Sequence, residues 1–351
     1  MSKVTFVDQK LKIKNLIEIM DKEKFEIAIC LNNKKEVIGV FTEGDFRKSV
    51  YKSVNLDSAI IKILNKKFIS VQKNYKIENI KKIFNNNILN YIIILDGKKY
   101  FSNISRENFF NKSTQKVKNT QVIIVAGGEG TRMKPFTNIF PKGLIPVNGR
   151  PLIDLIIDNF KKYKYMKFNI TTNYKSPIFK SYFKHKIDKS SVKLYEEKKK
   201  LGTAGSLFFF KKKIKNNFFV TNCDVMIEAD YDDILNLHVK NKNVLTIVAS
   251  FKNFKIPYGV CQINKSGVLK EIKEKPESNY LINTGFYVMS PKIFKFISNN
   301  KFLEMDQLIN GLVKSKAKIG VYPIYNNSWF DFGQWSDFKK SEEILRQNGK
   351  S

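Results

Sequence analysis

Cysteine and histidine are scarce in this chain of 351 residues. Its three cysteines, Cys30, Cys223 and Cys261, are scattered and odd in number, which argues against a disulfide framework and against a zinc site. Its two histidines, His185 and His238, lie in polar stretches without hydrophobic periodicity, so we expect both at the surface. A catalytic triad built on histidine is therefore not expected.

Long hydrophobic runs are also absent. No apolar run approaches the roughly 20 residues that a membrane-spanning helix needs. The first ten residues, MSKVTFVDQK, are polar and do not resemble a secretory signal. We therefore expect a cytoplasmic protein. Its hydrophobic content of 42% is enough for a packed core, and its length accommodates two domains.

Acidic residues are few: 32 oppose 63 basic residues, which gives a formal net charge of +31. Such a charge raises the question of nucleic-acid or membrane binding. Only five of the basic residues are arginine, and asparagine, isoleucine and phenylalanine are abundant. These residues share A/T-rich codons with lysine, so a genome-wide base bias explains the charge. Nucleic-acid surfaces usually combine arginine with aromatic residues in local patches, so we expect neither partner.

The first third of the chain contains an internal repeat. Residues 4–20 (VTFVDQKLKIKNLIEIM) align with residues 68–84 (FISVQKNYKIENIKKIF), and residues 26–35 align with residues 90–99 at the same spacing of 64. Each copy predicts a strand, an amphipathic helix, two strands joined by a turn, and the start of another helix. This order resembles a pair of cystathionine-β-synthase (CBS) modules, an α+β arrangement that covers about residues 1–112.

The CBS resemblance implies a regulatory or dimerisation module that binds an adenine nucleotide. In such modules a Thr/Ser-x-x-Asp stretch holds the ribose, and the first copy has Thr42 and Asp45 at these positions. The second copy has Asn108 instead of the acid, and a neutral amide accepts hydrogen bonds less strongly than a carboxylate, so we expect at most one good site. Alternatively, Thr42 and Asp45 cap the helix that follows them. The polar residues 113–120 predict a linker.

From residue 121 onward, short apolar runs alternate with helical patterns, which predicts an α/β domain over residues 121–351. We expect a Rossmann-like, mostly parallel mixed sheet, with its ligand beyond the carboxyl ends of the strands. The first run, VIIVA, ends there in the glycine-rich GGEGTR. Neither a P-loop nor a dinucleotide fingerprint fits, because Thr131 and Arg132 follow Gly130, and Met133 occupies the place of a third glycine.

The residues after this strand are suited to a nucleotide. Glycines allow backbone N–H groups to approach phosphates closely. Arg132 offers a forked, permanent charge, and Lys142 offers a compact second one. The string G-x-G-T-R-x-x-P-x-T-x-x-x-P-K-x-x-x-P-V, residues 128–147, resembles the signature of sugar-1-phosphate nucleotidyltransferases.

Further motifs follow in the order of that family, so that the resemblance spans about residues 121–340. They are LGTAGSL (201–207), FFVTNCD (218–224), YGV (258–260), EKP (274–276), NTGFYVM (283–289) and WFDFGQWSDF (329–338). One departure is Cys223, where most members have glycine; we expect its side chain to narrow the floor of the pocket.

The resemblance implies that a nucleoside triphosphate and a sugar-1-phosphate form a nucleoside-diphosphate sugar and pyrophosphate, by Mg²⁺-dependent in-line attack on the α-phosphorus. It assigns catalysis to Arg132, Lys142 and Asp224, and Mg²⁺ binding to Asp224 and Asp331. The implied nucleotide-binding residues are Val125, Ala126, Gly127, Gly128, Gly130, Thr131, Gly202 and Thr203. The implied sugar-phosphate-binding residues are Tyr258, Gly259, Glu274, Lys275, Asn283 and Thr284. We also expect a homo-oligomer.

The LGTAGSL loop is more similar to guanylyl-transferring members than to thymidylyl ones. A CBS pair fused ahead of the domain is similar to enzymes that activate sugars for bacterial surface glycans. Together they favour GTP and glucosamine-1-phosphate, as in legionaminic acid synthesis. Alternatives are a mannose- or heptose-1-phosphate guanylyltransferase and a uridylyl or cytidylyl enzyme. Two other classes are a nucleotide-sensing regulator with an inactive transferase domain, which pyrophosphate release would exclude, and a nucleic-acid binder, which would show steep salt dependence.

Overall fold

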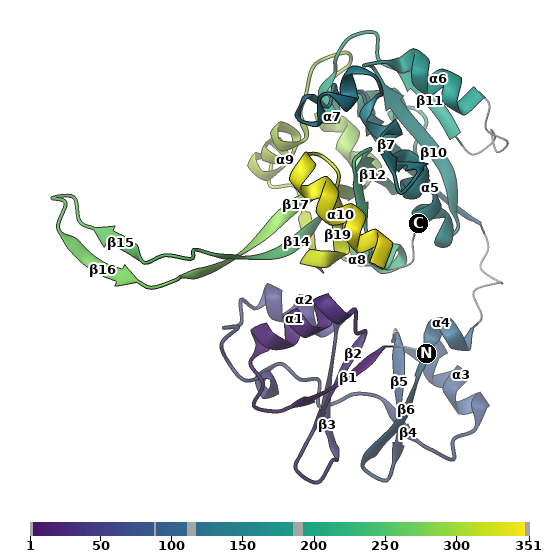
Figure 1. Ribbon diagram of the computed structural model, residues 1–351. Coiled ribbons are helices and arrows are strands. Elements are labelled where there is room, and N and C mark those ends of the chain that lie inside the picture. Colours follow the sequence, from purple (N-terminus) through teal and green to yellow (C-terminus); the bar gives the residue numbers. More distant parts are fainter. Residues whose placement is uncertain (1–2, 88, 111–116, 185–191, 348–351) are drawn as a thin grey trace. The chain divides into compact units, whose positions relative to one another are not determined.

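The computed structural model describes residues 3–87, 89–110, 117–184 and 192–347. The chain forms two compact units, residues 1–115 and 116–351, which are described separately below (Figure 1). His185 lies outside the described residues. Among the residues described, no helix is both long enough and apolar enough to cross a membrane.

The first unit contains two copies of one element order. The first copy is β1 (Val4–Asp8), α1 (Ile13–Glu23), β2 (Ile27–Leu31), β3 (Val37–Thr42) and α2 (Glu43–Tyr51). The second is β4 (Ser70–Gln72), α3 (Ile77–Asn86), β5 (Tyr91–Asp96), β6 (Lys99–Ser105) and α4 (Arg106–Phe109). In both copies the first strand pairs parallel with the second, and the second pairs antiparallel with the third. This is the order that the repeat predicts.

The two copies share a hydrophobic core. Ile27 and Ile29 of the first copy belong to one buried cluster with Ile93 and Leu95 of the second. The helices add their apolar faces, as the three- and four-residue spacing of buried positions in α1 shows. The repeat therefore folds as a single unit.

The second unit is built on a seven-stranded sheet in the order β11-β10-β7-β12-β17-β14-β18. The strands are β7 (Lys118–Ala126), β10 (Tyr165–Thr172), β11 (Val192–Glu196), β12 (Phe218–Asn222), β14 (Leu245–Lys255), β17 (Glu277–Met289) and β18 (Ile319–Tyr325). Only β17 runs antiparallel to its neighbours. This is the mostly parallel mixed sheet that the sequence predicts.

Helices cover both faces of this sheet, which explains why its inner strands are continuously apolar. Val122 and Ile124 of β7 pack into one core cluster, and Ile123 and Val125 pack into another. The first cluster includes side chains of α5 (Leu152–Lys162), α6 (Ser176–Lys184), α8 (Tyr231–Lys240) and α10 (Trp335–Gln347). The second includes those of α7 (Gly202–Gly205) and α9 (Met305–Lys314).

Three small two-stranded sheets complete the unit. They pair β8 (Pro146–Val147) with β9 (Arg150–Pro151), β13 (Val225–Ile227) with β19 (Trp329–Asp331), and β15 (Val260–Ile263) with β16 (Leu269–Lys273).

The predicted linker is too long at its carboxyl end. Strand β7 begins at Lys118, inside the stretch 113–120, and residues 113–116 lie outside the described residues. Lys118 pairs with Tyr165 of β10, and its ammonium group forms an ion pair with Asp232. A polar strand end is stable here because its charge is neutralised at the margin of the sheet.

Strands β14 and β17 continue past the sheet as a two-stranded ribbon, which we call the arm (residues 252–280). The last residue of β14 to pair with β18 is Phe251, and the strands of the arm pair onward to Lys255 and Glu277. Figure 1 shows the arm projecting from the sheet, with β15 and β16 toward its tip. Its exposed apolar side chains are Phe254, Ile256, Tyr258, Ile263, Val268, Leu269, Ile272 and Tyr280.

The prediction that His238 lies at the surface is wrong. Its ring is buried, and its Nδ1 lies 2.8 Å from the Thr246 hydroxyl. Tyr231, Ile234 and His238 form the buried face of α8 at helical spacing, a pattern that the polar sequence around them obscures. Burial lowers the pKa of His238 to about 4.

This histidine makes stability depend on pH. The unfolded chain takes up a proton at His238 near pH 6.5 and the folded chain only near pH 4, so stability present above pH 6.5 is lost as the pH falls toward 4. Between pH 7 and pH 5, we expect the wild type to lose up to about 2 kcal/mol more unfolding free energy than His238→Gln loses. Urea denaturation at both pH values measures this difference. Equal losses in the two proteins would assign the pH dependence to other groups.

Candidate active site

A glycine-rich loop follows β7 at the carboxyl edge of the sheet. Gly130 has a φ of +65°, and a Cβ there would lie 2.8 Å from the Thr137 side chain, so the turn requires glycine. No heavy atom of the described chain lies within 4 Å of a Cβ built on Gly128. Arg132, in the short 3₁₀ helix Thr131–Met133, is exposed and forms no ion pair with any described residue. The loop therefore presents an open backbone and a guanidinium group to solvent.

Lys142 and Asp224 meet at the same edge. Lys142 begins the 3₁₀ helix Lys142–Leu144, and Asp224 lies between β12 and β13. The Lys142 ammonium forms an ion pair with Asp224 Oδ2, and the two side chains are only 12% and 13% exposed. The sheet thus holds together two charges that are 82 residues apart in the sequence.

Asp331 joins this pair. Strands β13 and β19 pair Val225 with Asp331, and the Phe332 amide donates to the Asp224 carbonyl at 2.9 Å. A Cβ built on Gly333 would lie 2.7 Å from Asp331 Oδ1, 3.1 Å from Asp224 Oδ2 and 3.5 Å from Lys142 Nζ. Lys142, Asp224 and Asp331 therefore surround one glycine, and we call them the charged cluster.

Two carboxylates and one ammonium leave the charged cluster short of positive charge. The pKa of Asp331 is raised, first by burial and then by the charge of Asp224, although Lys142 opposes this effect. Two nearby carboxylates in a partly buried site are suited to a divalent cation, and Mg²⁺ needs only one or two protein carboxylates beside phosphate oxygens and water. Among the residues described, no group of three or more His, Cys, Asp or Glu side chains could hold a metal.

Cys223 packs into the apolar core. A Cβ on Gly143 would lie 3.3 Å from the Cys223 Cβ, and Phe179 belongs to the same buried cluster. The sequence predicts that this side chain narrows the pocket floor; in the structure it is a core side chain. Burial raises the pKa of its thiol to about 12, so a thiolate nucleophile is not expected.

The predicted nucleotide-binding loop at Gly202 and Thr203 is docked on α9. A Cβ on Gly202 would lie 2.5 Å from the Leu303 carbonyl oxygen. The Thr203 hydroxyl donates to Glu304 Oε2 at 2.7 Å and accepts from the Met305 amide at 2.8 Å. The Thr203 side chain thus caps α9. Val125 and Ala126 are buried at the end of β7.

Two of the predicted sugar-binding residues lie near the charged cluster. Gly285 follows Asn283 and Thr284, and a Cβ on it would lie 2.7 Å from Asn222 Nδ2, at the end of β12. The Asn283 amide donates to the Tyr287 hydroxyl at 3.0 Å. The buried Thr284 hydroxyl donates to the Val248 carbonyl at 2.8 Å, where the pairing of β14 and β17 shifts register. Asn283 is therefore more available to a ligand than Thr284.

The other four predicted sugar-binding residues lie on the arm. Tyr258 is 74% exposed, and a Cβ on Gly259 would lie 3.0 Å from Glu274 Oε2. Lys275 Nζ lies 3.9 Å from Glu274 Oε1. Strand β17 is extended from Glu277 to Asn283, a separation of six residues that corresponds to about 20 Å, and Lys275 lies two residues before the start of this strand. The structure groups these four residues with each other and does not bring them to the charged cluster.

One buried acid at this edge is not among the residues that the sequence predicts. Glu197 follows β11 and is only 4% exposed. Its Oε2 accepts from the Leu201 amide at 3.0 Å, and its backbone oxygen accepts from Asn173 Nδ2 at 2.8 Å. In the sequence, Glu197 belongs to the highly charged run EEKKK, a pattern that is typical of solvated loop residues. The available signal was its place at the end of a strand, directly before LGTAGSL.

An α/β sheet with an open glycine loop and a charged cluster at its carboxyl edge is the architecture of a nucleotide-handling enzyme. Residues 121–348 match the nucleotidyl transferase family, and the chain belongs to that family. The enzyme class predicted from the sequence is thereby confirmed.

The most similar curated proteins include sugar-1-phosphate nucleotidyltransferases. The chain is 28% identical over 220 residues to D-glycero-alpha-D-manno-heptose 1-phosphate guanylyltransferase of Campylobacter jejuni, covering 62% of this chain and 96% of that protein. It is 30% identical over 232 residues to the bifunctional protein GlmU of Methanococcus aeolicus, covering 64% of this chain but only 54% of that protein. The crystal structure of HddC from Yersinia pseudotuberculosis is similar in fold, with a TM-score of 0.51 and 25% identity over 64% of this chain and 99% of that one.

Proposed function

We propose that this nucleotidyltransferase is a sugar-1-phosphate guanylyltransferase that forms GDP-glucosamine and pyrophosphate from GTP and glucosamine-1-phosphate. The observation that carries the proposal is the charged cluster of Lys142, Asp224 and Asp331 near the carboxyl edge of the sheet. The guanylyltransferase of Campylobacter jejuni among its relatives supports GTP. The product would serve a bacterial surface glycan such as legionaminic acid. Mannose- and heptose-1-phosphate remain the alternative sugars, and UTP and CTP the alternative nucleotides.

The positive groups of the site would manage the phosphate charge. Arg132 is exposed beside the glycine loop, where it would hold the leaving pyrophosphate. Lys142 would stabilise the charge that grows on the α-phosphate during in-line attack. Gly127, Gly128 and Gly130 would allow the nucleotide to approach the backbone.

Asp224 and Asp331 would hold Mg²⁺, because their carboxylates converge on Gly333. When bound, Mg²⁺ neutralises phosphate charge and orients the triphosphate. The contribution of the chain is to keep both carboxylates in place through the pairing of β13 with β19. The ion pair to Lys142 fixes the orientation of Asp224.

Lys275 would bind the phosphate of the sugar-1-phosphate beside Glu274, and Tyr258, Gly259, Asn283 and Thr284 would line the sugar. Because four of these residues lie on the arm, within one chain this role requires the arm to fold back toward the charged cluster when the substrate binds. We expect Lys275→Ala to raise the KM for the sugar-1-phosphate at least about tenfold, the loss of one charge-assisted contact, without changing the KM for GTP. Lys273→Ala is the matched control, because Lys273 lies two residues away and is similarly exposed. Steady-state kinetics that show equal effects in both variants would remove Lys275 from the site.

The test of the function is pyrophosphate release with Mg²⁺, comparing GTP, UTP, CTP, dTTP and ATP against glucosamine-, N-acetylglucosamine-, mannose- and glucose-1-phosphate. The highest kcat/KM is expected for GTP with glucosamine-1-phosphate. A different preferred pair would keep the reaction and replace the substrates. Failure of every pair, with and without added adenine nucleotide, would contradict the proposal.

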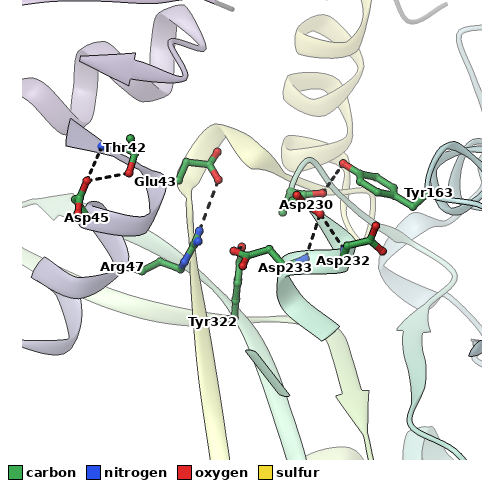
Figure 2. Close-up of polar contacts among 10 residues, drawn as sticks. Thr42, Glu43, Asp45, Arg47, Tyr163, Asp230, Asp232, Asp233 and Tyr322 are labelled. Carbon is green, nitrogen blue, oxygen red and sulfur yellow. Dashed lines mark hydrogen bonds and ion pairs between the residues drawn. The ribbon is translucent and has the colours of Figure 1, made fainter. Parts of the chain in front are cut away.

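For residues 1–112 we propose a CBS pair, supported by the repeated element order. Figure 2 shows how Thr42 and Asp45 are arranged: Asp45 Oδ2 accepts from the Thr42 amide at 3.2 Å and from its hydroxyl at 2.9 Å. The bond from the Thr42 amide, together with the bond that the Asp45 amide donates to the Thr42 side chain, forms a capping box at the start of α2 and so supports the capping alternative. A thermal shift with AMP, absent in Asp45→Asn, would instead assign a nucleotide site to these residues.

Residues 121–351 would be the nucleotidyltransferase domain. The exposed apolar side chains of the arm support the expectation of a homo-oligomer. Light scattering of the purified chain tests this expectation, and a monomer at micromolar concentration would contradict it.

A further inference from the structure

Four of the predicted sugar-binding residues lie where the strand pairing of the arm is interrupted. The base of the arm pairs residues 252–255 with residues 277–280, and its tip pairs β15 with β16. Tyr258, Gly259, Glu274 and Lys275 lie between these two paired segments. The side chain of Lys275 is 59% exposed, so its ammonium group is available to an anion.

The paired base of the arm keeps these residues away from the charged cluster of their own chain. Asn253 donates to the Asn279 side chain at 2.9 Å, and Lys255 forms an ion pair with Glu277 at 3.4 Å, so side chains as well as backbone join the two strands. Bending at the interruption would move the tip but would leave Lys275 beyond the base. To reach its own cluster, the arm would have to open or sharply bend this paired segment.

The arm also has an exposed apolar face. At its tip, Ile263 pairs with Leu269, and residues directly opposite each other in a sheet point to the same face. Gln262 and Glu271 are paired on the other face, because successive side chains alternate. Ile263, Leu269 and the neighbouring Ile272 are all more than half exposed. An exposed apolar face of this kind is typical of a surface that binds another protein.

A second exposed apolar surface precedes Lys142 of the charged cluster. Phe136, Ile139 and Phe140 are 43%, 65% and 43% exposed, and we call them the rim patch. The Lys175 ammonium donates to the Ile139 carbonyl at 3.0 Å, which holds this segment against the body of the sheet domain. The rim patch is therefore a preformed apolar surface beside the proposed active site.

We propose that the arm of one copy lies across the active-site edge of a second copy, with its apolar face on the rim patch and Lys275 beside the charged cluster of that copy. Each chain has an arm without a cluster near it and a cluster without a sugar-phosphate lysine near it, so a second copy supplies what each lacks. Reciprocal exchange of two arms closes a two-fold dimer and leaves neither arm exposed. This inference rests on the proposed function and deepens it, because each active site is composed of two chains.

The test combines two variants of the full-length chain in one dimer. Lys275→Ala and Asp224→Asn chains carry different affinity tags, are expressed together, and are purified over both tags. If Lys275 acts on the other chain, one of the two sites in this dimer is intact, and kcat/KM for the sugar-1-phosphate should be about half that of the wild type. If it acts on its own chain, both sites are impaired and about 5% remains, given the tenfold effect of Lys275→Ala.

The matched control places both substitutions on one chain and pairs it with a wild-type chain. The expected values then exchange: about 5% if the arm acts on the other chain and about half if it acts on its own. Three results overturn the inference. They are the reverse order of the two dimers, equal activity in both, and failure of the chain to associate. Equal activity together with full activity of Lys275→Ala alone would also remove Lys275 from the proposed site.

A second measurement requires no catalysis and therefore separates this inference from the proposed function. Unlabelled and ¹⁵N-labelled wild-type chains are denatured, refolded together and treated with an amine-reactive crosslinker. We expect links from Lys270 or Lys273 of the arm to Lys134 or Lys175 beside the rim patch, about half of them joining a light to a heavy peptide. Links between peptides of the same label alone would place the arm on its own chain. That result, or the absence of all such links, overturns the inference.

Discussion

Asp224→Asn is expected to lower kcat for pyrophosphate release about 100-fold or more while leaving the fold intact. Asparagine has nearly the same shape, so the turn between β12 and β13 should be retained. It removes the negative charge that pairs with Lys142 and that would hold Mg²⁺ beside Asp331. A fixed charge at the reacting phosphate is worth far more in a partly buried site than in water.

Steady-state kinetics over a Mg²⁺ titration and a thermal melt together measure this prediction. Asp158→Asn is the matched control, because Asp158 forms an ion pair with Arg150 in an exposed part of α5. The control should keep its activity. Near-normal turnover in Asp224→Asn would remove Asp224 from the mechanism. A large drop in melting temperature would instead assign it a structural role.

Lys142→Met should have an effect of similar size, with kcat reduced about 100- to 1,000-fold. Methionine retains the packing of the aliphatic stem and removes only the charge. If Lys142 acts on the charge that develops in the transition state, kcat and kcat/KM fall together. A change confined to the KM for GTP would mean that Lys142 contributes binding only.

Lys118→Met separates catalysis from stability. Lys118 also forms a partly buried ion pair with an aspartate, Asp232, but at the far end of β7. We expect this variant to melt at a lower temperature and to keep its kcat, whereas Lys142→Met loses kcat. Equal behaviour of the two variants would mean that both lysines only stabilise the sheet.

Much of the charged cluster could be predicted from the sequence because its residues belong to short motifs. Lys142 stands in a proline-framed turn, and Asp224 ends an apolar run, so each is marked by its neighbours. Their meeting with Asp331 depends on the order of strands in the sheet and on the pairing of β13 with β19. The motif order implied that meeting, and the strand pairing shows how it is achieved.

The rest depended on features that local sequence does not mark. His238 and Glu197 are polar residues in charged surroundings, and only the tertiary packing of α8 and β11 buries them. The residues around Lys275 carry a recognisable motif, but the motif contains no information on how far β14 and β17 extend beyond the sheet. Long-range packing, rather than residue type, decides these cases.

The distribution of the three thiols over the fold has a practical consequence. Cys30 and Cys223 are buried, with pKa values raised to about 11 and about 12, so neither offers an accessible thiolate. Cys261 is exposed on β15, toward the tip of the arm. A maleimide dye should therefore label the native chain at this one position without any engineered substitution. Its emission would report directly whether the arm is covered when GTP and a sugar phosphate are added.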